Sequence, residues 1–374
     1  MIEIREVKGK SMLRKFIDFP VKLYKGCEYF TPYLYEDEIE NLSPGKNPQT
    51  SHCIFKLLLA YKDGKIVGRV CGIINKYANE KYNQKRVRFN RIDMIDDIEV
   101  TKALLKAVEE FGLEYGLDEI VGPLGYSDQD KEGMLTYGFD QKNSFMTFYT
   151  YEYYVEHLKK LGYVEDAVWN EYRVPIPKEM DPLFTKLSVL CQKRFKLRPV
   201  QLKKNENLKP YVEEVLSLTN KCYADLYGYV PYSKDEMHHL AAQYLPMIDP
   251  KYLPMVYNEN NDLVAYGLMI HTPVDALKRH NGHLFPFGFI DFLHEIKHSK
   301  VLDMLLVAVD PDYREKGALA IILEQGIRNA ISDGIEYAET GPTLTENKEI
   351  QAMWARFNRV HHKTRACFIK PIEK

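Results

Sequence analysis

Apolar and polar residues follow a clear pattern between Leu302 and Gly334, where the spacing changes from that of a strand to that of a helix. The run LDMLLVAV is short and mostly apolar, and it ends before Asp310-Pro311, which predicts a buried strand. The residues after it place apolar side chains at helical spacing, which predicts an amphipathic helix that ends at Gly334. The apolar stripe consists of Leu319, Ile322, Leu323, Ile327, Ala330 and Ile331.

The turn between this strand and this helix is basic and contains a glycine. It reads Tyr-Arg-Glu-Lys-Gly-Ala from Tyr313 to Ala318. Free backbone N–H groups and the cationic side chains of Arg314 and Lys316 therefore meet at the start of a helix, where the helix dipole also favours negative charge. The turn thus predicts a binding site for an anion such as a phosphate group.

Two hairpins and a group of prolines organise the rest of the chain. Asp63-Gly64 and the turn Asn258–Asp262 each separate two apolar, strand-like runs. Pro175, Pro177 and Pro182 interrupt the pattern between these hairpins. We therefore predict two domains, residues 1–177 and residues 178–374.

The two halves also resemble each other in order and in sequence. The strand Ile66–Ile73 corresponds to Leu263–Ile270, and the stretch Gly116–Pro123 corresponds to Gly334–Pro342. Each copy of the second stretch follows an amphipathic helix, so we predict that one α/β unit occurs twice. The basic turn is present only in the second copy. In the first copy Asp96-Asp97 begins the helix, and these carboxylates would repel a phosphate.

The pattern V-x-P-x-Y-R-x-K-G followed by a helix resembles the pyrophosphate-binding motif of the GNAT N-acetyltransferase superfamily, Q/R-x-x-G-x-G/A. Arg314 and Gly317 match this motif, and Leu319 stands where the family has a small residue. The resemblance implies an α/β (α+β) fold of two tandem GNAT-like domains, each a mixed, mostly antiparallel sheet flanked by helices. On this reading residues 1–177 lack a cofactor site, and residues 178–374 carry it.

The resemblance also implies an activity, the transfer of an acyl group from acetyl-CoA or another acyl-CoA to an amine of a small molecule or peptide. A backbone N–H near Ala308–Val309 would hold the oxyanion. The residues expected to bind the cofactor are Val307, Ala308, Val309, Arg314, Glu315, Lys316, Gly317, Ala318, Leu319 and Asn347.

Transfer further needs a base for the amine proton and an acid for the leaving thiolate. Glu339 and Glu346 are the candidate bases, with a solvated surface carboxylate as the plain alternative for each. Many GNAT enzymes use the Tyr of N-x-x-A-x-x-L-Y as the acid, but here Trp354 occupies that position, and an indole N–H does not donate a proton in this pH range. Either Tyr313 or Tyr337 is the acid, or the thiolate leaves without one, or the protein is not an acetyltransferase.

Net charge, apolar runs and cysteine spacing limit the partners and the compartment that we expect for this protein. The net charge of −2 gives no reason to expect a nucleic acid or a membrane as partner, and no apolar run reaches the length of a membrane span. The six cysteines form no C-x-x-C pair, so neither a zinc site nor a disulfide framework is predicted. We expect a cytoplasmic protein without a metal.

Three alternatives remain open at this stage. His294, Glu295 and His298 match the H-E-x-x-H zinc-protease pattern, but the helix available to them is short. A Fem-like aminoacyl transferase would need a basic groove for tRNA, which the near-neutral charge does not favour. A non-catalytic ligand-binding or regulatory protein is favoured by the missing tyrosine and the missing small residue.

Overall fold

The structure is a computed structural model that describes residues 1–127, 130–203 and 205–373. The elements of the first half are β1 (Ile2–Glu6), α1 (Gly9–Leu23), α2 (Tyr35–Asn41), β2 (Cys53–Lys62), β3 (Lys65–Asn75), α3 (Lys76–Lys81), β4 (Arg86–Met94), α4 (Ile98–Glu114), β5 (Glu119–Gly122), β6 (Met134–Tyr137), α5 (Glu152–Lys160) and β7 (Val164–Pro175). Those of the second half are α6 (Pro182–Phe195), β8 (Arg198–Val200), α7 (Val212–Tyr223), α8 (Lys234–Tyr244), β9 (Met255–Tyr257), β10 (Leu263–His271), α9 (Val274–Arg279), α10 (Gly288–His298), β11 (Val301–Val309), the 3₁₀ turn η5 (Pro311–Lys316), α11 (Ala318–Ser332), β12 (Tyr337–Thr340), β13 (Thr343–Leu344), α12 (Lys348–Trp354) and β14 (Val360–Pro371).

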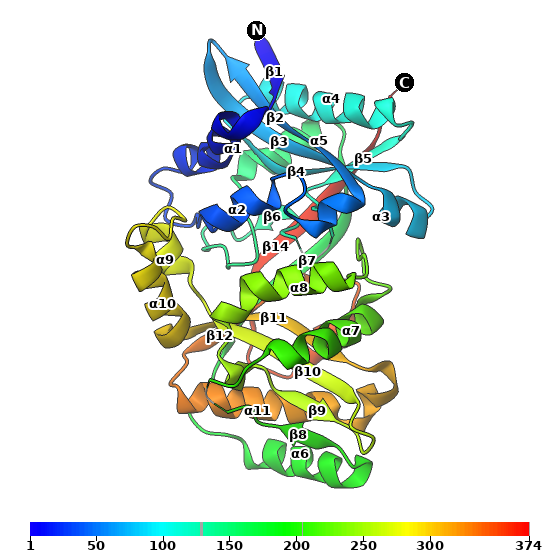
Figure 1. The fold of residues 1–374 in the computed structure, drawn as a ribbon, viewed down its shortest axis with the longest axis vertical. Helices are drawn as coiled ribbons and strands as arrows, with labels where there is room; N and C mark the ends of the chain where they lie inside the picture. Colours follow the sequence, from blue (N-terminus) through cyan, green and yellow to red (C-terminus); the bar gives the residue numbers. More distant parts are fainter. Residues whose placement is uncertain (128–129, 204, 374) are drawn as a thin grey trace.

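One mixed sheet of 14 strands runs through the whole molecule (Figure 1). Its main path is β1-β2-β3-β4-β5-β14-β7-β12-β11-β10-β9-β8, while β6 pairs with β14 and β13 pairs with β7. Most neighbouring pairs are antiparallel, and the pairs β4–β5 and β11–β12 are parallel. A mixed sheet with helices on its faces is the fold class that the sequence predicts.

The duplicated unit is visible in the order of the elements. In each half an antiparallel hairpin leads to a third strand, then to a helix, and then to a short strand that lies parallel to the third. The helices α4 and α11 are the two that cross over in this way. Asp97 begins α4, because its side chain accepts a hydrogen bond from the Glu99 N–H at 3.0 Å.

The last strand of the chain, β14, lies among the strands of the first half. β14 pairs with β5 on one side and with β7 on the other, while β7 pairs with β12 of the second half. The first half therefore takes up β14 from the second half, and β7 joins the two halves. The predicted boundary at residue 177 falls in the linker between β7 and α6 and remains a prediction.

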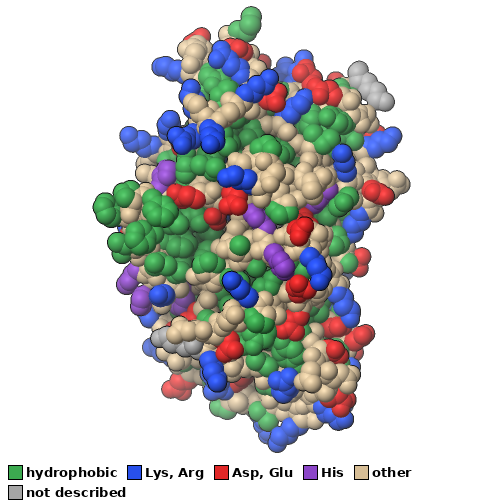
Figure 2. Space-filling model, in the orientation of Figure 1, with side chains coloured by type: hydrophobic (Ala, Val, Ile, Leu, Met, Phe, Trp, Pro, Cys, Tyr) green, Lys and Arg blue, Asp and Glu red, His purple; other side chains and the backbone are tan. Residues whose placement is uncertain are grey.

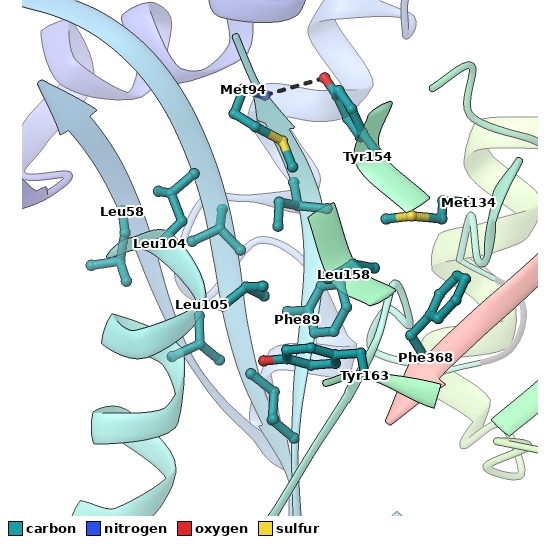
Figure 3. Close-up of a cluster of buried hydrophobic side chains, with 14 of the residues drawn as sticks. Leu58, Phe89, Met94, Leu104, Leu105, Met134, Tyr154, Leu158, Tyr163 and Phe368 are labelled. Carbon is teal, nitrogen blue, oxygen red and sulfur yellow. Dashed lines mark hydrogen bonds between the residues drawn. The ribbon is translucent and has the colours of Figure 1, made fainter. Parts of the chain in front are cut away.

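The largest group of buried apolar side chains shows this exchange directly (Figure 3). Phe89 from β4, Leu104 and Leu105 from α4, and Leu158 from α5 pack together with Phe368 from β14. Phe368 is fully buried. The core of the first half is thus completed by residues near the end of the chain.

Candidate functional site

Strands β11 and β12 separate where the second half would bind a cofactor. They pair from Val301 opposite Tyr337 to Met304 opposite Thr340, and the Gly341 N–H still donates to the Met304 carbonyl at 3.1 Å. Beyond that point β11 continues to Val309 beside β10 only. A bulge at Leu305, where the register with β10 shifts, turns β11 away from β12.

A cavity of about 920 Å³ occupies this separation. Its volume lies toward the upper end of the range usual for small-molecule sites. Its walls come from β10, β11, α11 along most of its length, β12 and the segment after it, α12, the end of α7 and the end of β7. The residues used below are Val307, Ala308, Val309, Arg314, Glu315, Leu319, Glu346, Asn347, Glu349, Trp354, Cys222, Tyr223 and Tyr227.

The basic turn lies at one end of this cavity. η5 covers Pro311–Lys316, and Gly317 follows in the left-handed region with φ of 76°. A side chain at position 317 would be strained, and its Cβ would come within 2.3 Å of the Cys191 sulfur, so glycine is required there. The N–H groups of the first turn of α11 follow at once. The Arg314 guanidinium lies 3.5 Å from the Glu349 carboxylate, and both side chains are largely exposed.

The backbone of β11 faces the cavity at alternate residues. Tyr223, at the end of α7, donates its hydroxyl to the Val307 carbonyl at 2.9 Å and accepts from the Val307 N–H at 3.3 Å. The Cys222 thiol donates to the Val309 carbonyl at 3.3 Å. Since N–H and carbonyl groups alternate sides along a strand, Val307 and Val309 face the gap while Ala308 faces β10.

Most of the residues predicted to bind the cofactor line the cavity. These are Val307, Ala308, Val309, Arg314, Glu315, Leu319 and Asn347, together with the candidate base Glu346. Gly317 and Ala318 form the start of α11 and are not among the residues that line the cavity. Lys316 is turned away, because its ammonium lies 4.3 Å from the centre of the Tyr313 ring. The roles assigned to all of these residues remain predictions.

Two predicted catalytic residues lie outside the wall of the cavity. The Tyr313 hydroxyl accepts a hydrogen bond from the Asn258 amide at 3.1 Å, and its side chain packs against the buried cluster that includes Ala318 and Ile321. Glu339 is buried on β12, where Arg173 donates to it at 2.9 Å and Lys363 at 3.3 Å. Burial opposes its ionisation, but Lys363, His362 and Arg173 together outweigh burial, and the pKa of Glu339 is lowered.

Residues of the first half also line the cavity. Asp130, Glu132 and Met146 contribute to its wall. The Asp130 carboxylate also pairs with Arg91 at 3.0 Å. Sequence reasoning did not find these residues, nor Tyr223, because they come together only in the folded chain.

A second, smaller cavity of about 110 Å³ lies between α7, α8 and the sheet. Apolar side chains form most of its wall. It shares four lining residues with the large cavity: Met146, Leu268, Leu305 and Leu306. The two cavities are therefore neighbours separated by these side chains, and the smaller one suits an apolar group.

The zinc-like motif lies on α10, away from this site. The rings of His294 and His298 stack at 4.4 Å, and Glu295 accepts from Arg279 at 2.9 Å. Within residues 1–127, 130–203 and 205–373, no three His, Cys, Asp or Glu side chains are placed to hold a metal ion. Nothing in the described geometry of α10 favours the zinc hydrolase alternative.

Comparison with protein-family models gives no match. Two curated proteins are similar along nearly the whole chain. Protein YghO of Escherichia coli is 27% identical over 383 residues, covering 99% of this chain and 95% of its own length. A protein of Caulobacter vibrioides named bacterial ceramide synthase is 24% identical over 386 residues, covering 99% of this chain and 98% of its own.

Solved structures show the same arrangement at low identity. A tandem GNAT protein from the clavulanic acid biosynthesis pathway superposes with a TM-score of 0.59 at 8% identity, covering 100% of this chain and 99% of its own. An Enterococcus faecalis protein described as a probable N-acyltransferase superposes with a TM-score of 0.51 at 7% identity, covering 100% of this chain and 73% of its own.

Proposed function

We propose that this chain, which has a tandem GNAT fold, is an N-acyltransferase that takes its acyl group from an acyl-CoA. The observation that carries the proposal is the cavity between β11 and β12, whose wall includes both the basic turn and carboxylates of the first half. The start of α11 and Arg314 would hold the diphosphate. Glu132 would accept a hydrogen bond from the amine of the acceptor, while Asp130 stays paired with Arg91.

In the proposed reaction the amine nitrogen bonds to the acyl carbon, the carbon–sulfur bond breaks, and CoA leaves as a thiol. A base receives the amine proton, and Glu346 is the predicted base that reaches the cavity. An N–H of β11 that faces the gap, at Val307 or Val309, would stabilise the oxyanion. The Tyr223 hydroxyl contacts the backbone of β11 and is the candidate proton donor to the sulfur of CoA.

We further propose that one substrate carries a long apolar chain rather than only an acetyl group. The small apolar cavity adjoins the large one at Leu305 and Leu306, where β11 bulges. An acyl tail placed there would be removed from water, which contributes roughly 0.8 kcal/mol per buried methylene. The similarity to a protein named ceramide synthase supports an acceptor or donor of this kind.

Binding of CoA by the turn is tested by isothermal titration of the full chain with CoA and three variants. Arg314→Ala should weaken binding about tenfold, because one charge-assisted hydrogen bond is lost. Glu349→Gln should tighten binding about twofold, since it frees Arg314 and removes a negative charge from the cavity. Arg328→Ala, the same change on the exposed face of α11, should have no effect. No CoA binding by the wild-type protein would overturn the proposal.

The preference for the length of the acyl chain is tested separately, with acetyl-, octanoyl- and palmitoyl-CoA as donors and a long-chain amino alcohol as acceptor. Release of free thiol should be faster with the longer donors. Leu216→Trp, which fills the small cavity from α7, should reverse that preference and leave the affinity for CoA itself unchanged. Equal rates for all donors would refute the apolar-chain proposal while leaving acyl transfer in place.

A further inference from the structure

The segment between β10 and β11 exposes a group of large apolar side chains. Phe285 and Phe287 are 70% and 71% exposed, and Ile290 is 58% exposed. With Phe289 and Leu293 they form what we call the aromatic face. Figure 2 shows hydrophobic side chains gathered at the left edge of the molecule, over α9 and α10. Apolar patches on a protein surface commonly mark a site of interaction.

The aromatic face is held by a well-packed scaffold. The other side of α10 buries Phe292 and Ile296 against the second half. At the start of the segment Gly282 packs so closely on the Tyr33 carbonyl that a Cβ would lie 2.0 Å from its oxygen. Gly288 is similarly close to the His283 carbonyl. These close contacts fix the backbone that carries Phe285 and Phe287.

The charges around the aromatic face favour a negatively charged partner. Asp275 pairs with Lys142 at 3.0 Å. Arg279 is shared by two carboxylates of α10, Asp291 at 2.8 Å and Glu295 at 2.9 Å, so this group keeps one negative charge. Lys297, exposed on the same helix, forms no ion pair with any residue that the structure describes. Within the described part of the chain, Lys278 on α9 donates only to the backbone carbonyl of Glu28. Lys278 and Lys297 together therefore outweigh the one uncompensated carboxylate, and a net positive charge remains at the rim.

We propose that the aromatic face docks on an anionic phospholipid surface. Phenylalanine side chains insert at the boundary between headgroups and acyl chains, and cations at the rim contact the lipid phosphates. A second copy of the chain fits less well, because a two-fold contact through this face would bring the rim cations of both copies together. Within the described residues, no helix is long and apolar enough to cross a bilayer.

Docking by this face would bring lipid close to the candidate site. The buried side of α9 and α10 packs on Met146 and Leu305, and both of these residues line the two cavities. An amine or acyl donor with a long chain would then reach the site from the membrane surface. Vesicle binding itself does not depend on acyl transfer, so the two proposals fail independently.

The test is flotation of the full-length protein with vesicles of phosphatidylcholine, with and without about one third phosphatidylglycerol. The wild-type protein should float with the anionic vesicles, and less at high salt. Phe285→Ser combined with Phe287→Ser should lower the bound fraction at least about tenfold. The thermal unfolding of this variant should be unchanged, because both side chains are exposed.

A matched control lies on α6 at the far end of the molecule (Figure 1). Leu183 and Leu187 are exposed apolar residues, and changing both to Ser should leave flotation unaltered. The proposal is overturned if the wild-type protein does not float, if the phenylalanine variant floats equally, or if the α6 variant loses as much binding. It is also overturned if the phenylalanine variant only converts a dimer to a monomer in size-exclusion chromatography.

Discussion

Tyr223 places a hydroxyl on the backbone of β11, at the strand where an acyl-CoA would lie. Its hydrogen bonds to both polar groups of Val307 allow two roles. The hydroxyl either donates a proton during the reaction or merely fills the gap until a substrate displaces it. Trp354 occupies the position where the resemblance expects a tyrosine, so a donor from α7 would supply the missing group.

If Tyr223 is the proton donor, Tyr223→Phe should lower kcat about a hundredfold and leave the affinity for CoA within about threefold. The measurement is the steady-state rate with a long-chain acyl-CoA, together with CoA titration. Tyr227→Phe is the control, since Tyr227 lines the same cavity but donates its hydroxyl to Asp166 at 2.6 Å. A variant that binds CoA more tightly at an unchanged rate would assign Tyr223 a blocking role.

Asp303 is a buried carboxyl group on β11, directly opposite Glu339 in the parallel pair. Burial, with a smaller effect from the charge of Glu339, raises the pKa of Asp303 to about 7. In the unfolded chain an aspartate has a pKa of about 3.9. Between these values the native state holds one proton more than the unfolded state, so stability falls as the pH rises through this window.

Asp303→Asn should remove this contribution and make the protein more stable at pH 8, by up to about 4 kcal/mol. Chemical unfolding at several pH values would show a flatter profile for the variant than for the wild-type protein. His362 contributes a slope of the opposite sign, because burial lowers its pKa to about 4, so only the difference between the two proteins is informative. An equal slope in both proteins would show that Asp303 is ionised in the native state.

At the scale of single elements, the local sequence pattern predicts some helices and strands correctly and misses others. The strand, turn and helix from Leu302 to Gly334 are observed as β11, η5 and α11, because periodic apolar residues and a glycine determine them locally. The tandem GNAT fold expected from the same motif is confirmed by the solved structures.

β14 could not be predicted in the same way. Its sequence carries His362, Lys363 and Arg365 at buried positions, and such a run has the composition of a surface segment. These charges are buried because β7 supplies Glu171 opposite them, a pairing between residues far apart in the chain. For the same reason the part of the cavity wall formed by Asp130 and Glu132 was not visible in the sequence.

Glu171 holds β7 and β14 together electrostatically. Lys363 lies 3.0 Å from its carboxylate, Arg365 also pairs with it, and all three side chains are fully buried. Burial opposes ionisation of Glu171, but the charges of Arg365 and Lys363 outweigh it and lower its pKa to about 2. Because the folded pKa lies below the unfolded value, the stabilisation is present at neutral pH and is lost as the pH falls from about 4.3 to about 2.

Glu171→Gln should lower the free energy of unfolding by about 3 kcal/mol, because it leaves the buried Arg365 without a carboxylate and Lys363 with Glu339 only. Urea unfolding at pH 7 measures the loss. Glu165→Gln on the same strand is the control, since its pair with Lys159 is exposed and should contribute no more than about 1 kcal/mol. Equal stabilities of the two variants would show that water or a neighbouring acid compensates the cations.

At the scale of the whole molecule, the sheet couples the two halves through β7 and β14. The predicted boundary at residue 177 treats the first half as a domain, yet residues 1–177 lack β14 and with it Phe368 of their own core. Glu171 would also be left without its cationic partners. A fragment of residues 1–177 should therefore show no cooperative thermal unfolding by circular dichroism, since an unpaired gap separates β5 from β7.

The matched experiment restores the missing strand to that fragment. β7 and β14 are antiparallel, with Arg173 opposite Val360, so a short glycine-containing turn can join residue 177 to residue 358. The joined fragment, residues 1–177 followed by 358–373, should unfold cooperatively and remain monomeric in size-exclusion chromatography. Cooperative unfolding of residues 1–177 alone would instead show that the first half folds without β14. In that case the insertion of β14 between β5 and β7 serves to position the cavity rather than to complete the core of the first half.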